Sequence, residues 1–225
     1  MTVVMTLPEL EKVNTAIVVL SAVETKINLN AQDVATVIRD PAASVLAQDA
    51  GGQPSVLEIT SMRDQVVITI SGGKVQFQDK SDETPGSSRL PRIVYDFLGL
   101  LQKQGLSRYR AYGINFDVAF DARGDQSAAE VIADRYVNKD ALSQKGQVNV
   151  RGAGLQLWFN HVDAVCDLKV EPRLGKMDAP RFYAHINYHF ELPDETMPPI
   201  DEFKTKYHGL WPQYIEMLET LFVRP

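Results

Sequence analysis

The sequence predicts an α+β fold in which two tandem β-α-β-β-β-α units form one mainly antiparallel, curved sheet with helices on one face. The first observation is a pattern that occurs twice. VLEITSMRDQVVITI at 56–70 and LWFNHVDAVCDLKV at 157–170 each contain a strand-like run, a polar turn and a second alternating run. The second observation is that apolar and polar residues alternate in most of the expected strands, which is typical of a sheet that buries one face.

The first unit is expected to cover residues 1–106. Gly72 and Gly73 in ITISGGKVQF predict a two-residue hairpin turn, because glycine adopts the positive φ angles of a primed turn. Asn30 is expected to cap the first helix, and Pro41 and Gly105 to end the two helices. The expected elements are a strand at 15–28, a helix in NAQDVATVIRDP, a loop with Gly51, Gly52 and Pro54, strands at 55–60, 65–71 and 74–79, and an amphipathic helix in RLPRIVYDFLGLLQKQG.

The second unit is expected to cover residues 107–225 and to repeat this order, so that the two units make one structural body. Pro212 lies inside the last expected helix and predicts a kink there or two shorter helices. The expected elements are a strand at 108–121, a helix in GDQSAAEVIADRY, strands at 148–160, 163–171 and 181–192, and a helix at 199–222.

Short matches between the units support a duplication. ATVIRD at 35–40 corresponds to AEVIAD at 129–134, and DET occurs at 82–84 and at 194–196. The resulting arrangement is similar to the duplicated saddle of TATA-box-binding proteins and, more loosely, to helix-grip ligand-binding folds. Because unrelated functions share such folds, this likeness concerns architecture only.

Two runs also resemble a family of uncharacterised bacterial two-lobed α+β proteins. They are QVVITISGGKVQF, followed by RIVYDFLGLLQKQGLSRYRAYGINF, and together they lie in about half of the chain. The resemblance implies a strand pair, a helix and a further strand in this order, and it implies no mechanism.

Composition narrows the classes of function. The net charge of −6 and the lack of basic runs make nucleic acid an unfavourable partner, since sequence-independent binding needs clustered Lys and Arg. The apolar stretch NTAIVVLSAV is far shorter than a membrane helix, and the N-terminus lacks the basic region of a signal peptide. The single cysteine, Cys166, fits a reducing compartment, so a cytoplasmic protein is expected. No motif for a cofactor, a metal or a phosphate loop is present.

One polar strand face is the candidate binding surface. In RFYAHINYHFEL the residues Tyr183, His185, Asn187 and His189 share a face, and Trp158 of the neighbouring hairpin is expected on the same side. The two histidines would lie roughly 13 Å apart on a strand, too far to bind one metal ion. Exposed aromatic rings with polar edges are typical of protein interfaces.

These observations predict a non-enzymatic binding or assembly protein that uses the open sheet face or a sheet edge to hold a protein partner or itself. No catalytic residue is assigned. The alternative is a helix-grip-like domain or enzyme that binds a small molecule between the sheet and the last helix. Its lining would be Tyr188, Phe190, Tyr207, Trp211 and Tyr214. A weaker alternative is nucleic-acid binding on a saddle surface by Lys74, Arg108, Arg110, Lys169 and Arg181.

Overall fold

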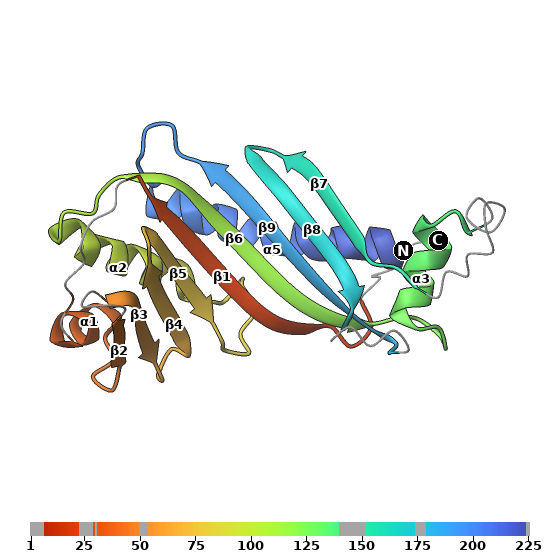
Figure 1. Cartoon of the computed structure of the whole chain (residues 1–225), viewed down its shortest axis with the longest axis horizontal. Helices are drawn as coiled ribbons and strands as arrows, with labels where there is room; N and C mark the ends of the chain where they lie inside the picture. Colours follow the sequence, from red (N-terminus) through yellow and green to blue (C-terminus); the bar gives the residue numbers. More distant parts are fainter. Residues whose placement is uncertain are drawn as a thin grey trace. The chain divides into compact units, whose positions relative to one another are not determined.

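The computed structural model describes residues 7–22, 29, 31–49, 54–139, 152–173 and 179–223. Within this part of the chain the strands form a nine-stranded sheet in the order β2-β3-β4-β5-β1-β6-β9-β8-β7 (Figure 1). The described pairings are antiparallel, which confirms the α+β class and the antiparallel sheet. The strands are β1 (Glu11–Ser21), β2 (Ser44–Asp49), β3 (Pro54–Ser61), β4 (Val66–Ser71), β5 (Lys74–Asp79), β6 (Tyr109–Asp121), β7 (Leu155–His161), β8 (Ala164–Pro172) and β9 (Arg181–Glu191). The helices are α1 (Ala31–Ile38), α2 (Leu90–Lys103), α3 (Ala128–Tyr136) and α5 (Ile200–Phe222).

Contacts divide the chain into two compact units that are discontinuous in sequence. Unit 1 contains residues 1–13, 116–187 and 211–225, and unit 2 contains residues 14–115 and 188–210. The division into lobes 1–106 and 107–225 rests on the sequence repeat and stays a prediction. Asn30, Gly51, Gly52 and the expected strand residues 23–28 lie outside the described residues.

Unit 2 is built on a hairpin that the sequence predicted. Gly72 and Gly73 have φ angles of +52° and +77° and connect β4 to β5. Alternation places Val75 and Phe77 of β5 in the core, and the ring of Phe97 from α2 meets Phe77 edge to face at 5.6 Å. In this unit α2 therefore covers the apolar side of the sheet.

The first half of the chain has one strand more than predicted. Residues Ser44–Asp49 form β2, which pairs with β3 and has a register shift between Gln48 and Asp49. Leu46 in this strand is 60% exposed, so β2 carries little of the apolar alternation by which the other strands were recognised. The observed order is β-α-β-β-β-β-α in the first half. β1 also begins at Glu11, earlier than the expected residue 15.

Unit 1 has an aromatic core between β6, β9 and α5. The rings of Phe120 and Phe182 stack at 4.8 Å, and Phe222 packs on Phe182 at 5.0 Å. Of the two outcomes predicted for Pro212, a kink or two shorter helices, the second is wrong, because α5 runs as one helix from Ile200 to Phe222 with Pro212 inside it.

A capping box starts α3, and its removal gives a first testable prediction. Ser127 Oγ accepts a hydrogen bond from the Glu130 amide at 3.2 Å, and Glu130 Oε2 accepts one from the Ser127 amide at 3.0 Å. Ser127→Ala is expected to lower the free energy of unfolding by about 1 kcal/mol, because the Glu130 amide in the first turn loses its acceptor. Urea denaturation measures the change. The control Thr205→Ala removes an exposed mid-helix hydroxyl and should not destabilise the protein. Equal effects of both variants would contradict the role of the cap.

Candidate functional site

The β7–β8 hairpin of unit 1 presents apolar side chains on the sheet face opposite the helices. Trp158 is 70% exposed and Val165 is 56% exposed. Trp158 pairs with Asp167 across the hairpin, and Val165 pairs with Asn160, so both apolar residues lie on one face. The polar residues next to Trp158 are hydrogen-bonded to each other: the Gln156 side-chain amide donates to Asp167 at 3.0 Å. The hairpin thus offers an aromatic contact surface that is bordered by polar groups.

A buried carboxylate organises the adjoining strands β6 and β9. Asp117 is 6% exposed, and its Oδ1 accepts hydrogen bonds from the Tyr183 hydroxyl at 2.7 Å and from His185 Nδ1 at 2.6 Å. Burial, and then the hydrogen bond to Asp117, raise the pKa of Tyr183 above its ordinary value, so this phenol stays a donor at neutral pH. Alternation predicted that Tyr183 and His185 share a face, but it did not predict their common acceptor.

The Asp117–His185 pair alone does not make a catalytic site. An aspartate that holds Nδ1 leaves Nε2 of the ring for proton transfer, as in hydrolase triads. In the described part of the chain, however, no hydroxyl or thiol is hydrogen-bonded to His185. Cys166 is fully buried, and burial raises the pKa of its thiol to about 11, which makes it a poor nucleophile. The hydrogen bonds show that Asp117 of β6 holds Tyr183 and His185 of β9.

Of the remaining two candidates on β9, Asn187 lies in the same unit as this cluster and His189 does not. Asn187 belongs to unit 1 and is half-buried. His189 belongs to unit 2, where its Nε2 lies 2.8 Å from Glu191 Oε1. The structure therefore brings Tyr183 and His185 together at Asp117 and pairs His189 with a different carboxylate.

An ion-pair network at the strand ends of unit 1 had no signal in the sequence. Glu11 lies 2.7 Å from Arg173 and 2.5 Å from Arg181, and Arg181 also binds Asp121 at 2.7 Å. The hydrogen bonds from Arg173 and then Arg181 hold the pKa of Glu11 below its ordinary value. The partners of Glu11 are more than 160 positions away in the chain, so no local pattern could have indicated them.

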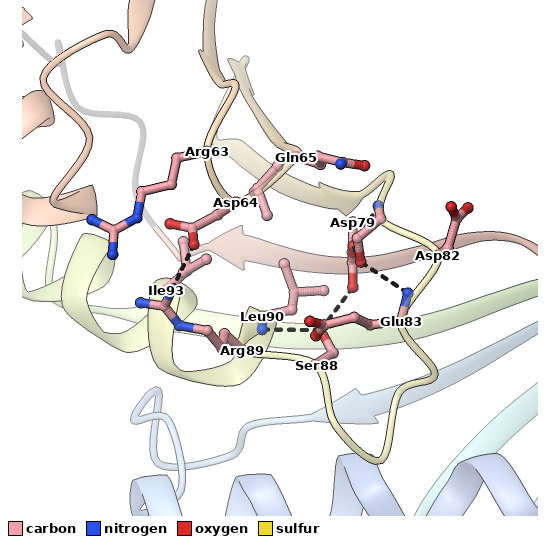
Figure 2. A pocket seen from close by; sticks show the side chains of 12 residues that line it. Arg63, Asp64, Gln65, Asp79, Asp82, Glu83, Ser88, Arg89, Leu90 and Ile93 are labelled. Carbon is pink, nitrogen blue, oxygen red and sulfur yellow. Dashed lines mark hydrogen bonds and ion pairs between the residues drawn. The ribbon is translucent and has the colours of Figure 1, made fainter.

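Unit 2 contains a cavity of about 550 Å³ at the start of α2 (Figure 2). Asp79, 2% exposed, accepts hydrogen bonds from the Ser81 hydroxyl at 2.6 Å and the Ser88 hydroxyl at 2.7 Å. Ser88 in turn accepts from the Leu90 amide at 3.1 Å, so Asp79 fixes the first turn of α2 against β5. We call this the large cavity. Its lining is Arg63, Asp64, Gln65, Val66, Asp79, Ser81, Asp82, Glu83, Ser88, Arg89, Leu90 and Ile93.

A second hollow in unit 2, the basic cavity, has a volume of about 280 Å³. Residues from the end of α1, the start of α2 and the first half of α5 line it. They are Val37, Ile38, Arg39, Ser88, Arg89, Arg92, Ile93, Asp96, Lys204 and His208. Sequence analysis did not predict it, because the three elements are distant in the chain.

Neither of these two cavities is lined by the aromatic residues predicted for a ligand pocket. Tyr188 and Phe190 are 1% and 3% exposed, and Tyr207 and Tyr214 are fully buried. Trp211 meets Phe116 edge to face at 5.4 Å. These side chains pack in the cores of their units.

Several of the cations proposed for a nucleic-acid surface form ion pairs with carboxylates. Lys169 pairs with Glu171 at 2.7 Å, and Arg108 pairs with Glu195. Arg181 belongs to the network with Glu11. Such pairs reduce the positive charge available to phosphates.

Comparison with known proteins identifies no family. No family model matches the chain, and no curated protein matches it. No helix in the described ranges is both long and apolar enough to span a bilayer. Among solved structures, "Methanococcus jannaschii TBP" is similar over 92% of this chain and 99% of that chain, with 12% sequence identity and a TM-score of 0.33. A likeness at this score carries no argument about function.

Proposed function

We propose that this protein is an assembly protein that binds a second copy of itself by pairing the β7 strands of the two copies. The observation that carries the proposal is an uncharged strand at the end of the sheet with the exposed Trp158 at its centre. The open face of unit 1 then continues from one copy into the other.

The strand β7 lacks the features that protect the edges of monomeric sheets. Such edges usually carry lysine, proline, an inward charge or a bulge. β7 reads LQLWFNH, and its pairing with β8 has no register shift. Leu157 and Phe159 on the helix side are only half-buried. By contrast, β2 at the other end of the sheet has a register shift. Among the described strands only β8 pairs with β7, and a strand edge without a second partner favours the addition of another strand.

The sequence of β7 is complementary to itself. In an antiparallel pair centred on Trp158, two copies of this ring lie on the two-fold axis. Leu157 then lies opposite the partner's Phe159, and Gln156 lies opposite the partner's Asn160. The apolar pairs lie on one face and the amide pairs on the other, as cross-strand packing requires. No charged side chain of β7 opposes its own copy, even though the chain has a net charge of −6.

A cysteine at the centre of the strand tests the pairing. Directly opposite residues of antiparallel strands have Cα atoms about 4.5–5.5 Å apart, within the range that a disulfide bridges. Trp158→Cys is therefore expected to give a covalent dimer on mild oxidation, measured on a non-reducing gel. The native Cys166 is fully buried and should not react.

Single substitutions away from the axis serve as matched controls. Asn160→Cys alone should not cross-link, because this residue opposes Gln156 of the other copy. A mixture of Asn160→Cys and Gln156→Cys should cross-link. Rapid cross-linking of Asn160→Cys by itself, or none with Trp158→Cys, would contradict the register.

We also propose a cytoplasmic location. A single free thiol, Cys166, supports it, because a chain with one cysteine cannot use an intramolecular disulfide.

A further inference from the structure

We propose that the basic cavity of unit 2 is a binding site for a phosphate dianion, either free or as a small phosphomonoester. It is independent of the assembly proposal, because β7 lies in unit 1. Four features of the cavity support the site: its charge, an unsatisfied ring nitrogen, a strained backbone position and its size.

The cavity carries positive charge that no described residue neutralises. Arg89 forms an ion pair with Asp64 at 2.6 Å, and Arg92 forms one with Asp96 at 3.1 Å. Arg39 and Lys204 have no such partner among the described residues, so their charges remain. A concentration of unmatched cations in a hollow of an acidic protein attracts an anion.

His208 contributes a ring nitrogen that has no partner among the described residues. Its Nε2 is inaccessible to solvent and makes no hydrogen bond to any of them. Polar atoms that are closed off from water normally have a partner, because an unsatisfied group costs free energy. His208 lies four positions after Lys204 on α5 and lines the same cavity, so a rotation of its ring would turn Nε2 to an anion seated there, which would supply the missing acceptor.

The backbone holds Arg39 in a conformation that its residue type disfavours. Its φ angle is +55°, in the left-handed region where glycine and asparagine are more common. The following residue, Asp40, is 3% exposed and anchors this turn by accepting bonds from the Ser61 hydroxyl at 2.8 Å and the Ala42 amide at 2.9 Å. Strained positions that the surrounding structure maintains occur preferentially at binding sites. Arg39 is thus prepositioned at the rim of the cavity.

The size and donors of the cavity select the ligand class. Its volume of about 280 Å³ lies just below the usual range of roughly 300–1,000 Å³ for drug-sized ligands. Guanidinium groups bind phosphate oxygens through paired N–H donors, and an ammonium adds a point charge. A compact anion with several oxygens, such as phosphate, can engage Arg39, Lys204 and His208 together.

Calorimetric titration of the full-length protein with inorganic phosphate and, in a separate arm, with glycerol phosphate tests the site. Saturable binding in at least one arm is expected at constant ionic strength in a chloride buffer. Tighter binding of glycerol phosphate would identify an ester ligand, and tighter binding of inorganic phosphate would identify the free ion. Both outcomes support the site, and the lack of saturable binding in both arms would overturn it.

Variants locate the binding in the cavity. The double substitution Arg39→Ala and Lys204→Ala is expected to weaken binding at least tenfold, because both unmatched charges are removed. Both side chains are at least partly exposed, so the fold should persist, as circular dichroism can verify. Lys103→Ala is the control, because it removes one exposed positive charge from the other end of α2. If Lys103→Ala weakens binding as much as the double variant, or the double variant binds like wild type, the assignment is wrong.

Discussion

Replacing Trp158 with lysine is expected to convert the proposed dimer into a monomer. The residue lies on the two-fold axis of the proposed strand pair, so each lysine would directly oppose its own copy. Like charges placed opposite each other destabilise a strand pair, and the large aromatic contact is lost at the same time. Light scattering after size-exclusion chromatography should report a mass near 25.1 kDa, the mass of one chain, instead of twice that value.

A charge swap distinguishes charge repulsion between the two β7 strands from misfolding of the variant. Trp158→Glu alone should also be monomeric, whereas an equimolar mixture of Trp158→Lys and Trp158→Glu should recover the dimer, since opposite charges now meet on the axis. Leu46→Lys is the matched control, because Leu46 is similarly exposed on the strand at the other end of the sheet. A dimer that survives Trp158→Lys, or that Leu46→Lys dissociates equally well, would refute the role of β7.

Removing the buried carboxylate of Asp117 is expected to destabilise the fold without changing assembly. Asp117→Ala leaves the Tyr183 hydroxyl and His185 Nδ1 without their acceptor. A donor left unsatisfied costs about 1–3 kcal/mol, and we expect a total loss of about 2 kcal/mol because both rings are only partly buried. The free energy of unfolding in urea at neutral pH measures the effect.

The conservative variant Asp117→Asn shows whether the acceptor atom matters. Both hydrogen bonds end on the same oxygen, Oδ1, which an asparagine can retain. Asp117→Asn should therefore lose clearly less stability than Asp117→Ala, while both variants keep the mass of the wild-type assembly. If the two variants lose the same free energy, the shared acceptor is not what stabilises β6 against β9.

Local patterns predicted most of the elements because the relevant interactions are close in sequence. The glycine pair at 72–73 predicted a turn that needs positive φ angles, and the structure confirms them. Alternation along β9 correctly separated the buried face from the polar face, whereas in β6 nearly every residue on both faces is buried. It failed for β2, a terminal strand in which Leu46 is exposed and the core imposes little pattern. Pro212 was expected to kink the last helix or divide it in two, and α5 continues through it as one helix.

The candidate sites depended on contacts that no local pattern contains. The sequence by itself determined the α+β class, the hairpins and the face on which Trp158, Tyr183 and His185 lie, because side-chain periodicity is a property of each strand. Only the tertiary structure decided that β7 ends the sheet, that Asp117 is the common acceptor of two side chains, and that Arg39 and Lys204 line one cavity. Each of these depends on which distant segments pair, and the order of the strands in the sheet sets that pairing.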